Sequence, residues 1–234
     1  MTLLAVAAGV TSIPLSMHGH WPLAVAAILF ACLMDGLDGR VAHLLKASSR
    51  IGEQLDSLAD LVNFGVAPAW LVYCKATEGV ETKDQEIYWA LWACVMVYVM
   101  CACYRLARFN GHLDDERRPE YWKYFFQGVP SPAAAGIVLT PILIDIYAKV
   151  LGCEPGLSAL GWLSGSVLIF AGIMMVSRIP TFSLKAPWLP RWAQITTIVA
   201  MVALNALLTP LYLLSIPVCW FVFRRYRDAE VPQG

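Results

Sequence analysis

The stretch MDGLDGRVAHLLKASSRIGEQLDSLAD, residues 34–60, places four aspartates close together in a chain that is otherwise poor in charge. They are Asp35, Asp38, Asp56 and Asp60. Of the 234 residues, 59% are hydrophobic and 15% are charged. Soluble domains carry about 25% charged residues, so this composition indicates an integral membrane protein. Carboxylates inside a membrane are costly, and four of them therefore need a shared physical reason.

Long apolar runs around this stretch predict an all-α membrane protein with about eight transmembrane helices. The predicted spans are 2–15, 22–45, 51–73, 87–107, 130–148, 157–176, 191–208 and 211–223. The whole chain, 1–234, is expected to form a single transmembrane domain. Residues 2–15 are not expected to be a signal peptide, because no basic segment precedes them. The polar stretches 75–86, 111–124 and 178–190 are predicted to be loops.

The basic residues divide unevenly between the two sides of the predicted membrane domain. One side receives Arg40, Lys46, Arg50, Arg105, Arg108, Arg117, Arg118, Lys123, Arg178, Lys185, Arg191, Arg224, Arg225 and Arg227. The other side receives Lys75, Lys83 and Lys149. Because cytoplasmic loops are enriched in Lys and Arg, the first side is expected to be cytoplasmic. Eight spans place both termini there, and the aspartates fall at the same face.

The spacing of the aspartates predicts one shared site. Asp35 and Asp38 lie three residues apart at the end of the second span, and Asp56 and Asp60 lie four apart at the start of the third. Each spacing puts a pair on one helix face, and the short link 46–50 makes the two helices antiparallel neighbours. Oxygen ligands suit Mg²⁺, Mn²⁺ or Ca²⁺. Two such cations would neutralise four carboxylates, an arrangement known from phosphoryl transfer.

Glycines within the same stretch fit a bulky anionic substrate. Gly36, Gly39 and Gly52 have no side chain, so a phosphate ester can approach the backbone closely. One alternative is that the aspartates are simply solvated, or paired with Lys46 and Arg50. Another is a cation transporter that uses the carboxylates as an ion path, although their clustering at one face argues against it. A purely structural scaffold leaves the acidic cluster unexplained.

The stretch resembles the signature of the CDP-alcohol phosphatidyltransferase family, D-x2-D-G-x2-A-R-x8-G-x3-D-x3-D. The residues in register are Asp35, Asp38, Gly39, Ala42, Gly52, Asp56 and Asp60. One position departs, since the signature arginine, which in the family helps to hold the CDP diphosphate, is His43 here. Histidine is a weaker and pH-dependent cation. Arg40, one turn earlier on the same face, is the candidate substitute.

Four further segments resemble the bacterial phosphatidylserine synthase branch of that family. They are DSLADLVNFGVAPA (56–69), RLARFN (105–110), FFQGVPSPAAAG (125–136) and SRIPTFSLK (177–185). The resemblance implies an all-helical homodimer of the bacterial inner membrane, with a six-helix core over about 1–190 and two added helices over about 191–223. It also implies transfer of a phosphatidyl group from CDP-diacylglycerol to L-serine, with release of CMP. A sister enzyme that uses glycerol 3-phosphate, inositol phosphate or choline is the nearest alternative.

The resemblance also assigns roles to residues. It makes Asp35, Asp38 and Asp56 the main ligands of two Mg²⁺ or Mn²⁺ ions, and Asp60 the general base that also contacts the second metal. The residues assigned to the CDP moiety are Gly39, Arg40, Ala42, His43 and Gly52.

A second anion site is predicted at the cytoplasmic end of the fourth span. Arg105 and Arg108 lie three residues apart there, and arginine presents a planar donor fork that suits a carboxylate or phosphate. With Asn110, they are expected to bind the serine carboxylate or the lipid phosphate, although a role as a topology anchor explains Arg108 equally well. Ser131, near the start of the fifth span, is open to a substrate role or to a role in helix capping.

Overall fold

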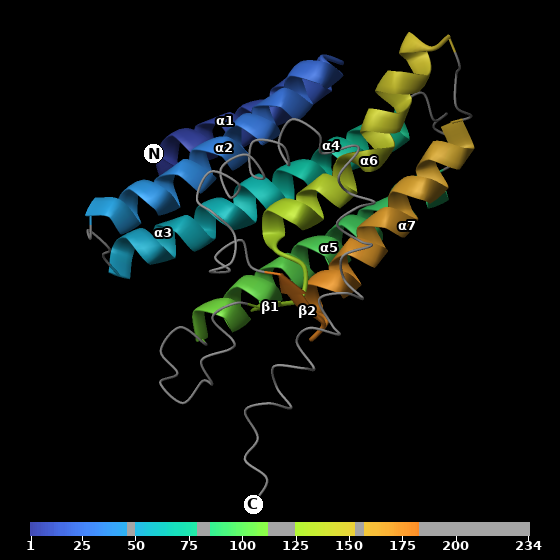
Figure 1. Ribbon diagram of the computed structural model, residues 1–234. Coiled ribbons are helices and arrows are strands. Elements are labelled where there is room, and N and C mark those ends of the chain that lie inside the picture. The colour runs from blue at the N-terminus through green and yellow to red at the C-terminus, as the bar shows by residue number, and fades with distance from the viewer. Residues whose placement is uncertain (46–49, 79–84, 112–124, 153–156, 183–234) are drawn as a thin grey trace, which may run out of the picture.

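The computed structural model describes residues 1–45, 50–78, 85–111, 125–152 and 157–182. Its helices are α1 (Thr2–Met17), α2 (Trp21–Leu45), α3 (Arg50–Asp60), the π-helix η1 (Leu61–Val66), α4 (Ala67–Thr77), α5 (Gln85–Gly111), α6 (Ser131–Val150) and α7 (Leu157–Val176). Because α3, η1 and α4 follow one another without a break, the described helices form six rods packed in one bundle (Figure 1). These rods correspond to the first six predicted spans. The predicted spans 191–208 and 211–223 lie outside the described residues.

The helices have the lengths and surfaces of membrane spans. Among the described residues, four segments are long and apolar enough to cross a membrane, namely Trp21–Asp38, Gln54–Thr77, Glu86–Gly111 and Ser131–Lys149. Two shorter apolar helices, Thr2–Met17 and Leu160–Val176, accompany them. Large apolar side chains such as Trp162 and Ile173 lie exposed on the bundle surface, as expected where lipid is the solvent. The predicted all-α membrane architecture is therefore confirmed.

Small residues let α1 pack closely on its neighbours. Its buried positions are Ala5, Gly9, Ser12 and Ser16, which recur along one helix face. A Cβ atom at Gly9 would lie 2.1 Å from the side-chain oxygen of Asn63 in η1. Only glycine fits at this contact, and small residues at such crossings are common where membrane helices approach one another.

The π-helix lies at the centre of the bundle and is not predicted by the sequence pattern. Phe64 of η1 and Tyr98 of α5 are both fully buried, and the Tyr98 hydroxyl donates a hydrogen bond of 2.8 Å to the Phe64 carbonyl oxygen. A π-helical turn is a local departure from α-helical geometry that is frequently found at functional sites. Here it follows directly after Asp60.

A small β-ribbon closes one end of the bundle. Strand β1 (Phe125–Gln127) pairs antiparallel with β2 (Pro180–Phe182), and Phe125 lies opposite Phe182. The prediction of a loop throughout 178–190 is therefore wrong at Pro180–Phe182. The strands pair because α6 begins and α7 ends at the same end of the bundle, which brings their flanking segments together (Figure 1).

Candidate active site

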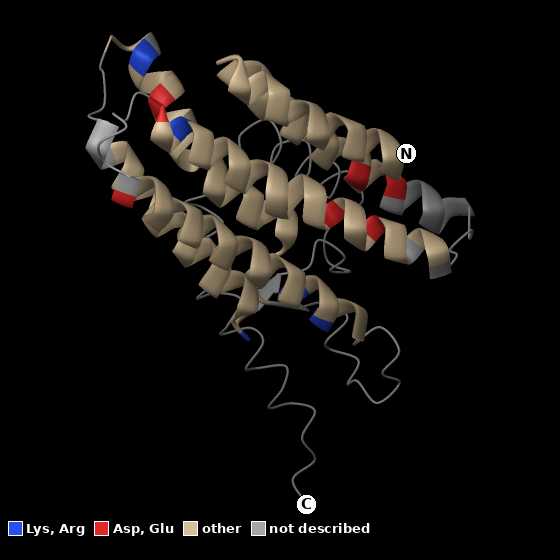
Figure 2. Cartoon of the chain, turned by 180° about the vertical axis from the view of Figure 1, so that it is seen from behind, with Lys and Arg blue, Asp and Glu red and all other residues tan. Residues whose placement is uncertain are grey.

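The two pairs of aspartates come from α2 and α3, which lie side by side near the N-terminus (Figure 2). The side chain of Asp35 lies within hydrogen-bonding range of Asp56 and of Asp60. Asp38 is close enough to Asp35 and Asp56 to interact with both electrostatically. The structure therefore brings together all four carboxyl groups. Like charges this close repel one another strongly in a membrane interior, so the arrangement is stable only if protons are shared between carboxyl groups or positive charge is bound nearby.

Asp38 also joins α2 to the start of α1, a contact that the sequence did not suggest. The backbone N–H of Thr2 donates a hydrogen bond of 2.9 Å to Asp38 Oδ2, and the Thr2 hydroxyl donates to the same oxygen. The first N–H groups of a helix have no partner within that helix, and a carboxylate there is favourable. Asp38 thus fixes α1 beside the acidic cluster.

Asp60 has the chemistry expected of a cation ligand. Its Oδ1 atom is shielded from solvent and has no hydrogen-bond partner within the described part of the chain. Buried polar atoms are nearly always satisfied, so such an oxygen calls for an explanation. No group of three or more His, Cys, Asp or Glu side chains among the described residues is preformed to hold a metal ion. The carboxyl groups are therefore neighbours that supply suitable oxygen donors, without yet forming one coordination shell.

Arg105 is a buried basic residue whose charge acts on Asp60. It lies on α5, its exposed fraction is 8%, and its guanidinium is close enough to Asp60 for electrostatic attraction. Its Nη1 atom donates a hydrogen bond of 2.5 Å to the Ser131 hydroxyl at the start of α6. A buried arginine inside a membrane protein is costly unless it is paired in this way. Of the three residues predicted for the second anion site, Arg105 is the one whose charge acts on Asp60.

The other two predicted anion-site residues make contacts that hold helices together. Arg108 donates to the carbonyl oxygen of Val176 at the end of α7 over 2.8 Å, and also to the carbonyl oxygens of Met175 and Ser177. The side-chain oxygen of Asn110 accepts a hydrogen bond of 3.1 Å from Ser57 on α3. These contacts favour structural roles for Arg108 and Asn110, and their substrate roles stay predictions.

The residues predicted to hold the CDP moiety are described less fully. Gly39, Arg40, Ala42 and His43 belong to α2, and their side-chain positions lie outside the described set. Gly52 is exposed in the first turn of α3. The replacement of the signature arginine by His43 therefore stays a prediction about function.

Two residues near the cluster were not selected from the sequence. Cys32 lies close to both Asp35 and Asp60. It precedes Asp35 by three residues, and this helical spacing could have indicated that the two side chains share a face of α2. Asn63 follows Asp60 by three residues, is fully buried, and both polar atoms of its side chain lack partners among the described residues. Because η1 is a π-helix, the α-helical spacing of three or four residues does not indicate that Asn63 lies near Asp60.

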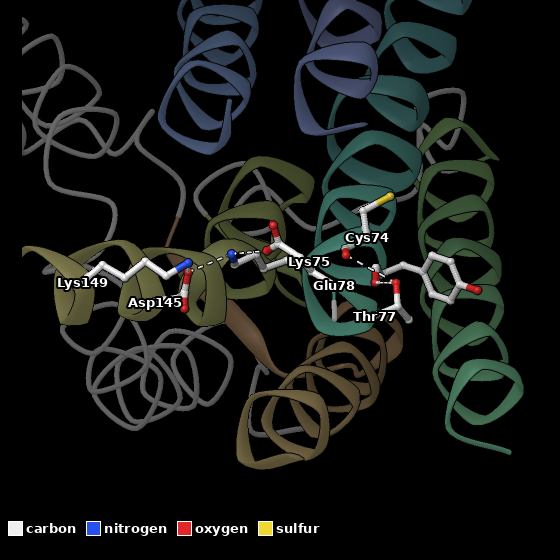
Figure 3. A network of polar contacts seen from close by, with 7 residues as sticks. Cys74, Lys75, Thr77, Glu78, Asp145 and Lys149 are labelled. Carbon is white, nitrogen blue, oxygen red and sulfur yellow. Dashed lines mark hydrogen bonds and ion pairs between the residues drawn. The ribbon is translucent and has the colours of Figure 1, made fainter. Parts of the chain in front are cut away.

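A second polar cluster lies at the opposite end of the bundle (Figure 3). Lys75 of α4 pairs with Asp145 of α6 at 2.9 Å, and the two side chains are 3% and 7% exposed. Lys75 also pairs with Glu78, and Asp145 with Lys149 at 3.1 Å. The Lys75 ammonium lies 4.8 Å from the centre of the Trp21 ring. Because its charges compensate one another, this cluster is explained by helix packing and was not predicted to belong to the site.

Comparisons with known proteins identify the same family that the acidic stretch resembles. The model of the family described as CDP-alcohol phosphatidyltransferase matches residues 1–158. A CDP-diacylglycerol–serine O-phosphatidyltransferase of Mycobacterium leprae is 40% identical over 180 residues, covering 77% of this chain and 56% of that protein. Its Mycobacterium tuberculosis counterpart is 36% identical over 217 residues, covering 92% and 71%. An archaetidylserine synthase of Methanothermobacter thermautotrophicus is 31% identical over 184 residues, covering 76% and 66%. The chain thus spans between about half and three quarters of the length of these relatives.

Proposed function

We propose, because this chain belongs to the CDP-alcohol phosphatidyltransferase family, that it transfers the phosphatidyl group of CDP-diacylglycerol to L-serine and releases CMP. The observation that carries the proposal is the convergence of Asp35, Asp56 and Asp60 at one end of the bundle. Serine as the acceptor is supported by the names of the relatives, which all refer to serine.

The four aspartates are the proposed ligands of two divalent cations, Mg²⁺ or Mn²⁺. Carboxylate oxygens are the donors these cations prefer, and the solvent-shielded Oδ1 of Asp60 fits that requirement. Bound here, the cations would supply the positive charge that stabilises the diphosphate as charge develops on it.

Asp60 and Arg105 are the proposed acceptor-binding pair. The hydroxyl and carboxylate of L-serine are carried on neighbouring carbon atoms, so two residues that attract each other electrostatically are candidates to contact the two groups. Arg105 binds the carboxylate, and Asp60 accepts the hydroxyl proton as general base. The serine oxygen then forms a bond to the phosphorus that carries diacylglycerol. The bond between that phosphorus and the bridging oxygen breaks, and CMP leaves with that oxygen.

The CDP moiety is assigned to the predicted residues of α2 and α3. Gly39, Ala42 and Gly52 would let the diphosphate approach the backbone, and Arg40 would supply the charge that His43 provides only in its protonated form. An Arg40→Ala variant is expected to bind CDP-diacylglycerol more weakly. Unchanged affinity would remove Arg40 from this role.

The deciding experiment is a CMP-release assay on the purified protein with CDP-diacylglycerol. Release should require both a divalent cation and L-serine, and Asp60→Asn should lower kcat by about 10²-fold or more. Glu86→Gln, which changes an exposed carboxylate at the start of α5, is the matched control and should keep full activity. Glycerol 3-phosphate, inositol phosphate and choline are tested in parallel. Metal-dependent cation flux in proteoliposomes without CMP formation would instead favour a transporter.

The aspartate end of the bundle is proposed to face the cytoplasm of a bacterial inner membrane. Arg105 and Arg108 lie at this end, and Lys75 and Lys149 lie at the other, in agreement with the positive-inside rule. In a background without native cysteines, an impermeant maleimide applied to intact cells should label Leu151→Cys. It should label a cysteine at Gly111 only after the cells are opened.

A homodimer is proposed from the family resemblance. Light scattering of the detergent-solubilised protein should therefore give twice the 25.8 kDa mass of one chain.

A further inference from the structure

The hydrogen bond between Arg105 and Ser131 joins two helices at the acceptor side of the proposed site. Arg105 Nη1 donates to Ser131 Oγ over 2.5 Å, and the two residues are 26 positions apart in the chain. Both side chains are buried, with exposed fractions of 8% and 1%. A hydrogen bond to a charged group contributes more than one between neutral groups, particularly where water is excluded. This contact therefore restricts the orientation of the guanidinium.

The Ser131 hydroxyl does not occupy the N-cap position of its helix. Ser131 is the first residue of α6, and the N-cap residue is Pro130. The neighbouring residues Pro130 and Pro132 limit the backbone conformations at this point. The backbone that carries the hydroxyl is thus restricted, and the hydroxyl accepts the hydrogen bond from Arg105.

The segment before Ser131 is anchored to the end of α7. Gly128 N–H donates to the Ile179 carbonyl oxygen over 2.9 Å, and Val129 N–H donates to the Met174 carbonyl oxygen over 3.2 Å. Arg108 holds the same end of α7 through the Val176 carbonyl oxygen. Contacts among α5, α6 and α7 therefore determine where Ser131 lies. Through its hydrogen bond to Ser131, Arg105 is held in place by the same contacts.

We propose that Ser131 is a positioning residue, whose hydroxyl fixes the Arg105 guanidinium in the orientation that receives the carboxylate of L-serine. This inference rests on the proposed function and names how its acceptor is recognised. Arginine carries five N–H donors in a planar fork. With one of them held by Ser131, the fork is ordered before the acceptor arrives, which reduces the entropy lost on binding.

The test is a comparison of Michaelis constants for the two substrates. Ser131→Ala should raise KM for L-serine about tenfold, the effect of losing one hydrogen bond to a charged group. It should change KM for CDP-diacylglycerol less than about twofold, whereas a general loss of structure would affect both. Ser131→Thr keeps a hydroxyl and should restore most of the affinity for L-serine. Ser164→Ala is the matched control, since Ser164 is also 1% exposed and its hydroxyl donates to the Leu160 carbonyl oxygen within its own helix, α7.

A double-mutant cycle keeps the test decisive if Ser131→Ala also lowers stability. Arg105→Lys retains the charge but removes the planar fork, so Ser131→Ala should have little further effect on KM for L-serine in that background. Additive effects would overturn the proposal, as would a Ser131→Ala enzyme whose KM for L-serine equals that of Ser164→Ala. A different result would refute the proposed function itself, namely that the unaltered protein releases no CMP when L-serine is added.

Discussion

The buried ion pair between Lys75 and Asp145 offers a test of how the bundle is held together at the end opposite the aspartates. We predict that Asp145→Leu strongly destabilises the protein, whereas the double variant Lys75→Met, Asp145→Leu recovers most of the loss. Both side chains are less than 10% exposed and lie 2.9 Å apart. Removal of one partner leaves the other charge buried, which costs about 3–5 kcal/mol, whereas replacement of both by apolar residues is often neutral.

The structure indicates that the loss of stability in Asp145→Leu lies near the lower limit of this range. After Asp145→Leu, the Lys75 ammonium still has Glu78, whose side chain is 49% exposed, and its contact with the Trp21 ring. We therefore expect a loss of about 3 kcal/mol. For a chain of this length, 1 kcal/mol shifts Tm by about 2–4 °C, so the apparent Tm should fall by about 6–12 °C. The double variant should melt within about 4 °C of the unaltered protein.

The assay is thermal unfolding in detergent, followed by circular dichroism at a fixed heating rate. Lys149→Gln is the control, because Lys149 pairs with the same carboxylate but is 53% exposed, and exposed pairs contribute about 0–1 kcal/mol. CMP release at a temperature where every variant is folded should be unchanged, since the pair lies far from Asp60. The reasoning is refuted if Asp145→Leu melts like the Lys149→Gln control, or if the double variant is as unstable as the single one.

Three substitutions test close contacts in the fold and should be measured by the same unfolding assay. Gly128→Ala should lower Tm markedly, because the φ angle is 76° and the new Cβ would lie 2.4 Å from the Met175 carbonyl oxygen; an unchanged Tm would contradict this geometry. Gly9→Ala should also destabilise, since its Cβ would lie 2.1 Å from the Asn63 side-chain oxygen, and Asn63→Ala should suppress the defect. Arg108→Gln should cost about 1.5–3 kcal/mol through its lost charge-assisted hydrogen bonds, and restoration by Arg108→Lys would show that a single cation suffices.

The membrane fold could largely be predicted from the sequence because hydrophobic length is a local property. The first six predicted spans correspond to helices, and fourteen of the seventeen basic residues were assigned to the side where the aspartates lie. The π-helix Leu61–Val66 and the strand Pro180–Phe182 could not be predicted. Each depends on partners elsewhere in the chain, such as the Tyr98 hydroxyl that binds the Phe64 carbonyl oxygen.

The candidate site could be predicted to the extent that its residues are close in sequence. Spacings of three and four residues, together with a short link, were enough to bring Asp35 and Asp60 together. The same reasoning treated Arg105 and Arg108 alike, because both lie on one helix end. The structure distinguishes them, since the charge of Arg105 acts on Asp60 whereas Arg108 binds the end of α7.

The sequence by itself determined that this is a helical membrane protein with a cluster of acids at one end, since apolar length and helical periodicity are encoded within single segments. Only the tertiary structure decided which side chains support that cluster. The contacts of Thr2 with Asp38 and of Arg105 with Ser131 join residues 36 and 26 positions apart. Such pairings arise when the packing of buried surfaces fixes the relative positions of whole helices, and no local pattern along the chain specifies them.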